Sequence, residues 1–273
     1  MRVVTEHWKY IFKNLWFVLP FSILPAVFLA LSADFGAVSI VMHKLFSGVF
    51  DLEFKEIFFA WSFFRCDSVL GGIYSALALL CLIFFSGFLL VFIEKHMRIG
   101  KRTLSGVFTQ LRDHAFSFIG IVVFFVVLYE VWALVLSAVL FMVTNFSSDI
   151  FARILFVIVS VIFIAALFYI ITAGYLWVPC KLHTGFRLYP ALIYSYGLLG
   201  GVRWRLFFSM LISYAVCFFV VIGSVFGPLW LTRLLAAIMF MFAYMSFIVR
   251  METLYFETDK LDREDLIRNY RGL

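Results

Sequence analysis

Six apolar runs, each long enough to cross a bilayer, constrain this 273-residue chain more than any other feature. A membrane-spanning helix needs about 20 mostly apolar residues. Hydrophobic residues make up 65% of the chain and charged residues only 14%, whereas soluble domains carry about 25% charged residues. The sequence therefore excludes a soluble fold and predicts an all-α polytopic membrane protein with a single membrane domain. We expect spans at residues 15–33, 69–93, 116–143, 151–178, 206–226 and 229–249, and a cytosolic tail at 250–273.

The basic residues predict how the spans are oriented. Cytoplasmic loops of membrane proteins are enriched in Lys and Arg. The N-terminal segment, the loops after the second and fourth spans, and the tail together hold 17 Lys and Arg residues, against five on the other side. We expect a multi-pass protein of the plasma membrane with both termini in the cytoplasm. The net charge of +6 then indicates contact with anionic lipids rather than with nucleic acid. The residues expected at the membrane surface are Lys9, Lys13, Lys101, Arg102, Arg112, Arg203 and Arg205.

Short amphipathic stretches precede the first, third and fifth spans. The first stripe consists of Val4, Trp8, Ile11 and Leu15, and similar stripes occur within 104–115 and 192–199. Such stripes predict helices that lie on the membrane surface. They also predict a threefold repeat of a surface helix followed by a helical hairpin. The alternative is that any helix on the inner surface shows such a stripe.

Two further segments depart from a simple hairpin pattern. Pro20 and Pro25 lie within the first span and predict a kink or partial break there. The long loop at 34–67 has an apolar stripe over 38–49 and predicts one or two helices at the outer interface. Its apolar segment 57–64 is too short to span, and the sequence leaves open whether it lies flat or enters the bilayer.

Glu130, near the middle of the third predicted span, is the sharpest functional candidate. An acid at this depth is costly unless it is paired, protonated or hydrated. Ser137 is the only polar residue on its helical face, and Tyr214 and Tyr244 lie at a similar depth in the fifth and sixth spans. We therefore expect a protonated carboxyl with a tyrosine partner, and a substrate- or proton-binding site formed by these four residues. The alternative is an acid that only joins two helices.

The sequence contains no H-E-x-x-H, P-loop or G-x-S-x-G motif. Cys180 and His183 form a lone C-x-x-H, and the second pair that a zinc site needs is missing. We therefore expect neither a metal ion nor another cofactor, and no enzymatic activity.

Residues 99–102, Ile-Gly-Lys-Arg, together with the amphipathic stretch and apolar run that follow them, resemble bacterial six-span membrane families. These include YesL-like proteins and the membrane domain of glycerophosphodiester-phosphodiesterase-like proteins. The resemblance implies a six-helix bacterial membrane protein and assigns no functional residue. Two functions stay open: a transporter or lipid-handling protein that uses Glu130, or a non-transporting membrane subunit that binds a partner protein through its tail.

Overall fold

The computed structural model describes residues 2–46, 50–65, 67–145 and 149–266, and every regular element within these ranges is an α-helix. Six of these helices are long and apolar enough to cross a membrane, which confirms the predicted fold class. The chain is therefore an integral membrane protein. The six long helices are α2 (Leu15–Ser32), α5 (Val69–Ile99), α6 (Val107–Thr144), α7 (Asp149–Ala173), α10 (Arg203–Val225) and α11 (Leu229–Thr258).

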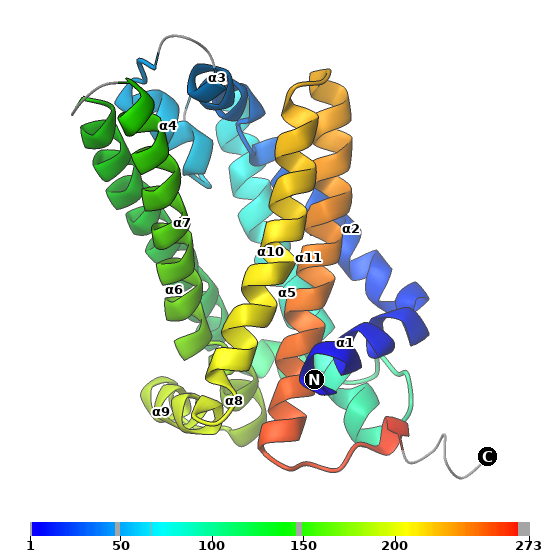
Figure 1. Cartoon of the computed structure of the whole chain (residues 1–273). Helices are drawn as coiled ribbons and strands as arrows, with labels where there is room; N and C mark the ends of the chain where they lie inside the picture. The colour runs from blue at the N-terminus through cyan, green and yellow to red at the C-terminus, as the bar shows by residue number, and fades with distance from the viewer. Residues whose placement is uncertain (1, 47–49, 66, 146–148, 267–273) are drawn as a thin grey trace.

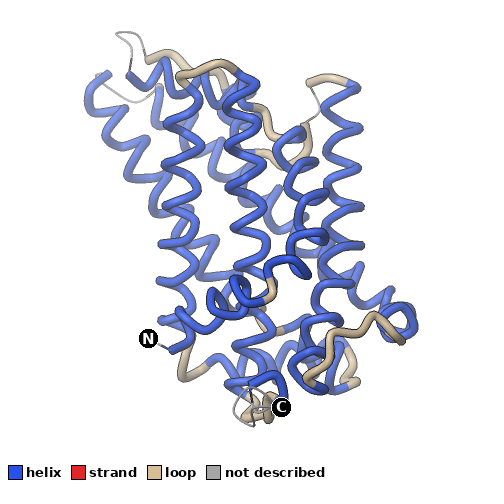
Figure 2. Tube along the Cα trace, turned by 90° about the vertical axis from the view of Figure 1, so that its right-hand side faces the viewer, coloured by secondary structure: helices blue, strands red, loops and turns tan. Residues whose placement is uncertain are grey.

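The shorter helices gather at the two ends of the bundle (Figure 1). One end carries α1 (Arg2–Lys13), α8 (Trp177–Thr184), α9 (Leu188–Leu199) and the C-terminal end of α11. The opposite end carries α3 (Phe35–Phe46) and α4 (Phe54–Trp61). We call these the α1/α9 end and the α3/α4 end. Figure 2 shows the long helices running between them.

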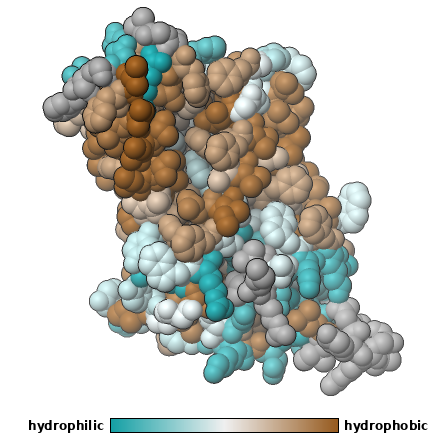
Figure 3. Space-filling view, in the orientation of Figure 1, coloured by the Kyte–Doolittle hydropathy of each residue, from teal (hydrophilic) through white to brown (hydrophobic). Residues whose placement is uncertain are grey.

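The bundle consists of a packed group of helices and a more peripheral hairpin. Helix α2 packs against α5 and α11, and α10 packs against α11, whereas α6 and α7 pack against each other. In α6 and in α7, only 17% of the residues in the most apolar 18-residue stretch are buried. The same share is 44% in α5 and in α11. The α6–α7 hairpin therefore presents most of its surface to lipid. The middle of the molecule is hydrophobic and the hydrophilic residues concentrate toward its ends (Figure 3).

Three groups of buried side chains lie within the described part of the bundle, and two of them join these parts. The larger group lies where α1, α5, α8 and α11 meet and includes Met97, Tyr175 and Tyr255. The second group joins α4 to the hairpin through Ile57 of α4, Leu136 of α6 and Phe156 of α7. The hairpin is thus attached to the α3/α4 end largely through α4.

The helix boundaries differ from the predicted ones at two places. Helix α6 begins at Val107 and continues to Thr144, so the expected surface helix at 104–115 is not separate from the third span. Helix α11 continues through Thr258, nine residues past the expected end of the sixth span, and the segment Arg250–Phe256 is buried. The threefold repeat stays a prediction, because its second unit has no separate surface helix.

Helix α2 is continuous through Pro20 and Pro25, so the first span is not broken there, and the kink stays a prediction. Each proline lacks the N–H that would bond to the carbonyl four residues earlier. The helix remains intact because α5 and α11 pack along it. The loop at 34–67 forms two helices, α3 and α4, as predicted, although residue 49 of its expected stripe lies outside the described residues.

Helix α1 packs into the bundle instead of only covering its end. His7, Tyr10 and Ile11 are buried, and the Tyr10 hydroxyl lies 2.8 Å from Nδ1 of His96 on α5. Of the predicted apolar stripe, Ile11 is buried and Trp8 is half-buried. The buried face therefore includes polar residues that a search for an apolar stripe overlooks.

An ion pair orders the connection between α4 and α5. Nε and Nη2 of Arg65 donate to the two carboxylate oxygens of Asp67 at 2.8 and 3.0 Å, and Asp34 lies 3.8 Å from the same guanidinium. The hydrogen bonds from Arg65 hold the pKa of Asp67 below its usual value. This pair lies outside the spanning helices and is partly exposed to solvent.

Replacing Asp67 with Asn should therefore lower thermal stability at neutral pH but not at strongly acid pH. The folded pKa lies below the unfolded value of about 3.9, so the stabilisation is present above that value and is lost as the pH falls through the folded pKa. Because the pair is partly exposed, we expect a difference of at most about 1 kcal/mol. Thermal unfolding of wild type and Asp67→Asn at pH 7 and pH 3 measures it. An equal difference at both pH values would contradict this assignment.

Candidate binding cavity

Glu130 holds the segment that follows α4 inside the bundle. Its Oε1 accepts hydrogen bonds from the backbone N–H groups of Phe63 at 2.7 Å and Phe64 at 2.9 Å. The Ser62 hydroxyl lies 3.0 Å from Oε2, and the neighbouring Tyr129 hydroxyl donates to the Trp61 carbonyl at 2.7 Å. Glu130 is about 21 Å from the C-terminal end of α6 along the helix axis. The segment 62–64 therefore enters the bundle rather than lying flat at its end.

The chemistry of this contact follows from the end of α4. A helix leaves backbone groups without partners at its ends, and such groups are costly away from water. The two N–H groups after α4 point at a carboxyl, which can accept from both. Ser62 Oγ also lies 3.0 Å from the Phe64 carbonyl, so its single proton can serve only one of two neighbouring oxygens. Glu130 thus replaces the hydrogen bonds that water would make at a surface loop.

The structure does not gather the four predicted site residues around one carboxyl. The Ser137 hydroxyl donates to the Ala133 carbonyl of its own helix at 2.7 Å. The Tyr244 hydroxyl lies 3.0 Å from Ser86 Oγ, and the Tyr214 ring packs 5.1 Å from the ring of Phe168. The hydrogen-bond partners described for Glu130 all come from residues 62–64, so the expected tyrosine partner was wrong.

Tyr214 and Tyr244 instead line a cavity of about 640 Å³ between the α6–α7 hairpin and helices α5, α10 and α11. The lining is predominantly apolar. Ligand sites in proteins typically measure about 300–1,000 Å³. A recess between α7 and α10 is visible in Figure 3, and lining residues come from both helices. Trp61, Ser62 and Phe63 form part of the wall, so Glu130 supports the cavity without lining it.

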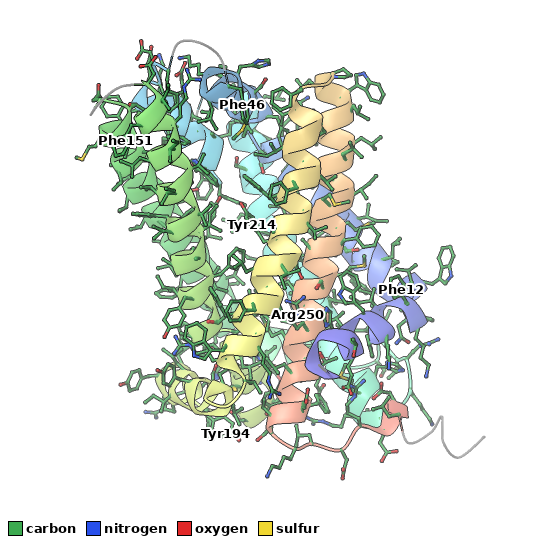
Figure 4. The ribbon with its side chains drawn as sticks, in the orientation of Figure 1. Phe12, Phe46, Phe151, Tyr194, Tyr214 and Arg250 are labelled. Atoms are coloured by element: carbon green, nitrogen blue, oxygen red, sulfur yellow. The ribbon has the colours of Figure 1, made fainter. Side chains whose placement is uncertain are left out.

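Arg250 lies at the α1/α9 end of this cavity and is only 2% exposed. Its Nη2 lies 2.9 Å from Ser246 Oγ, 3.0 Å from Ser213 Oγ and 3.2 Å from His7 Nε2. Its Nε is buried and has no hydrogen-bond partner, and no described carboxylate forms an ion pair with it. Figure 4 shows Arg250 on α11 near its crossing with α1, and Tyr214 farther along α10. A buried guanidinium without a counter-ion is costly unless a ligand supplies one.

His183 and Glu252 form a second buried polar contact toward the α1/α9 end. His183 Nε2 lies 3.1 Å from the Glu252 carboxylate, and both side chains are almost fully buried. Glu94 forms an ion pair with Arg98 at 2.7 Å, one helical turn farther along α5. Glu94 and Glu252 are thus each bonded to a base other than Arg250. Cys180 is buried, and no three His, Cys, Asp or Glu side chains within the described ranges are arranged to hold a metal ion.

Sequence reasoning missed Arg250 and Glu252 because it placed them in the tail. One signal would have found them: apolar residues continue at helical spacing after Val249, at Met251, Leu254 and Tyr255. The chain also has no Gly or Pro between Val249 and Asp259 that would end the helix.

The residues predicted at the membrane surface are largely exposed. Arg203 is the exception, because its guanidinium carbon lies 4.3 Å from the centroid of the Tyr169 ring and it donates to the Tyr196 hydroxyl. Arg102 is exposed but also donates to the Asn14 side chain at 2.7 Å. The exposed residues are Lys9, Lys13, Lys101, Arg102, Arg112 and Arg205.

Comparisons with protein-family models, curated proteins and solved structures find no match to this chain. Its function is therefore inferred from the cavity and from the polar residues around it.

Glu130→Ala should destabilise the protein by about 1–3 kcal/mol, because it leaves the N–H groups of Phe63 and Phe64 without an acceptor. Glu130→Gln should cost less, since an amide oxygen can still accept. Thermal unfolding in detergent and hydrogen exchange at residues 61–64 measure both effects. Ser137→Ala is the matched control on the same helix and should leave exchange at 61–64 unchanged. If Ala and Gln behaved alike, the carboxyl would not be supporting this segment.

Glu252→Ala should destabilise the protein by about 3 kcal/mol, because it leaves the buried His183 ring without its partner. The double replacement His183→Leu, Glu252→Leu should cost less than the two single replacements added together. A double-mutant cycle on thermal stability tests this coupling. Glu264→Ala, at an exposed position, should have little effect. Additive single replacements would show that the two side chains do not interact.

Proposed function

We propose that this protein is a transporter or lipid-handling protein of the plasma membrane that binds a hydrophobic molecule within the bundle. The observation that carries this proposal is the apolar cavity of about 640 Å³ between the hairpin and the packed helices. A bundle that served only to hold its helices together would gain stability by filling that space. The cavity walls come from helices throughout the chain, as expected for a site that the whole fold maintains.

The recess between α7 and α10 supports access from the lipid phase (Figure 3). Residues of both helices line the cavity, among them Phe168 of α7 and Tyr214 of α10. Their rings meet across this boundary. Passage between membrane and cavity then requires these two rings to separate, and it would not take a hydrophobic molecule through water.

The segment 61–63 forms part of the wall toward the α3/α4 end, and Glu130 holds it there. Under this proposal, Glu130 does not contact the bound molecule. It affects binding only by positioning the segment that forms this wall. Loss or gain of the contact to Phe63 and Phe64 would change the shape of the cavity at that end. If proton binding at Glu130 is coupled to substrate binding, the coupling then runs through this segment rather than through direct contact between Glu130 and the substrate.

We also infer that the α1/α9 end faces the cytoplasm. The helices at this end carry or adjoin most of the exposed basic residues, including Lys9, Lys13 and Arg205, and positive charge is enriched on that side of a membrane. The alternative function, a subunit that binds a partner through its tail, gains less support. Arg263 of the tail lies 3.7 Å from Glu6, and Asp259 accepts from the Tyr194 hydroxyl, so the described tail packs on its own chain.

A long-chain fatty alcohol with a mid-chain diazirine should photolabel peptides of α6 and α10 in protein reconstituted in nanodiscs. Ala243→Phe should reduce this labelling by about tenfold or more, because Ala243 lines the cavity and the ring occupies its space. Ala166→Phe makes the same change on an exposed face of α7 and is the matched control. Mass spectrometry quantifies the labelled peptides. Equal labelling in wild type and Ala243→Phe would overturn the proposed function.

A further inference from the structure

We propose that the cavity binds an amphiphile whose anionic head group, a carboxylate or a phosphate, pairs with Arg250 and whose hydrocarbon chain extends toward the α3/α4 end. This inference rests on the proposed function. It adds the charge of the bound molecule and its direction in the cavity.

Arg250 has the chemistry of an anion site. Arginine presents its N–H groups in a planar fork that binds carboxylate or phosphate through two parallel hydrogen bonds. Only Nη2 has described hydrogen-bond partners, and the buried Nε has none. The guanidinium therefore keeps donors for a further acceptor, and it lines the cavity. The hydroxyls of Ser213 and Ser246 also line the cavity beside it.

Among the described residues, the surroundings of Arg250 supply hydrogen-bond acceptors but no counter-ion. Its described acceptors are two serine hydroxyls and one histidine ring, none of which carries negative charge. The nearby Glu252 bonds to His183. Tyr175, which also lines the cavity, donates its hydroxyl proton to the Phe247 carbonyl. An anion from outside the chain would therefore neutralise a charge that the described part of the chain leaves unpaired.

The rest of the cavity suits a hydrocarbon chain. Along α10, the lining residues Met210 and Ile222 are about 18 Å apart at the helical rise. The side chains between Arg250 and the far end are mostly aromatic and aliphatic, as at Phe125 and Phe168. Apolar surface of this length binds an alkyl chain through the hydrophobic effect.

At the opposite end of the cavity the charged side chain in the lining is an acid, and this gives the ligand a direction. Asp34 lines the cavity there, accepts hydrogen bonds from the backbone of α3 and lies 3.8 Å from Arg65. An anionic head would be repelled by this carboxylate and attracted by Arg250. The head therefore lies at the α1/α9 end, with the chain directed toward Trp61 and Phe63.

Photolabelling with three probes of equal chain length tests the proposal. Each carries the same mid-chain diazirine, and the heads are a carboxylate, a phosphate monoester and an uncharged alcohol. In wild type, at least one anionic probe should label α6 and α10 at about tenfold lower concentration than the alcohol, as expected for charge-assisted hydrogen bonds. A preference for the carboxylate points to a free fatty acid as ligand, a preference for the phosphate points to a lipid phosphate, and equal preference supports the shared anionic chemistry.

Arg250→Gln should remove this preference, so that the carboxylate and phosphate probes label α6 and α10 no better than the alcohol does. Arg233→Gln is the matched control, because it makes the same change on α11 at an arginine that does not line the cavity. If Arg250→Gln does not fold, Arg250→Lys keeps the charge without the fork and should retain part of the preference.

The comparison of the three probes in wild type needs no variant, and by itself it tests whether the cavity prefers an anionic head group. Equal labelling of the cavity by all three probes would overturn the anionic ligand and leave the proposed function in place. Preference retained in Arg250→Gln would overturn the role of Arg250. Absence of cavity labelling by every probe, including the alcohol, would overturn both proposals.

Discussion

Backbone groups that lie away from water need hydrogen-bond partners, and this requirement determines how the cavity is closed at the α3/α4 end. Segment 62–64 is neither helix nor strand, so it cannot satisfy its N–H groups internally. The Glu130 carboxyl accepts from two of them, and the Tyr129 hydroxyl donates to the carbonyl of Trp61. Consecutive side chains of α6 therefore allow an irregular segment to enter the bundle. Without them, this segment would have to remain in water, and the cavity would lose part of its wall.

Charged side chains are paired differently at the two ends of the cavity. At the α3/α4 end, Asp34 and Asp67 share Arg65, so acid and base lie together. At the α1/α9 end, His183 bonds Glu252 and Arg98 bonds Glu94, whereas Arg250 has only neutral acceptors among the described residues. A ligand-binding site is expected where the fold holds a charged side chain in place without an oppositely charged partner. This asymmetry gives the cavity a polarity that its apolar walls alone would not have.

The sequence predicted the six spans because apolar runs of this length have no other stable solution in a lipid bilayer. It also identified Glu130 as a residue that needs a partner. The partner was not predictable, because backbone N–H groups are present at almost every position and leave no mark in the sequence. Arg250 was missed because the first charge after an apolar run was taken as the membrane boundary, although the helical apolar pattern continues at Met251 and Leu254. The buried face of α1 was only partly recognised, since His7 and Tyr10 are buried through polar contacts.

The contact between α1 and α11 has a consequence for the order in which the molecule is completed. His7 lies near the start of the sequence, and its partners Ser246 and Arg250 lie near the other end. Chains are synthesised from the N-terminus, so an early segment cannot contact a later one until the later one has been made. His7 therefore stays without these partners until α11 has been made and inserted. The polar end of the cavity is thus assembled last. A ribosome that stops before α11 leaves a chain in which several spans are present but the polar end of the cavity is missing.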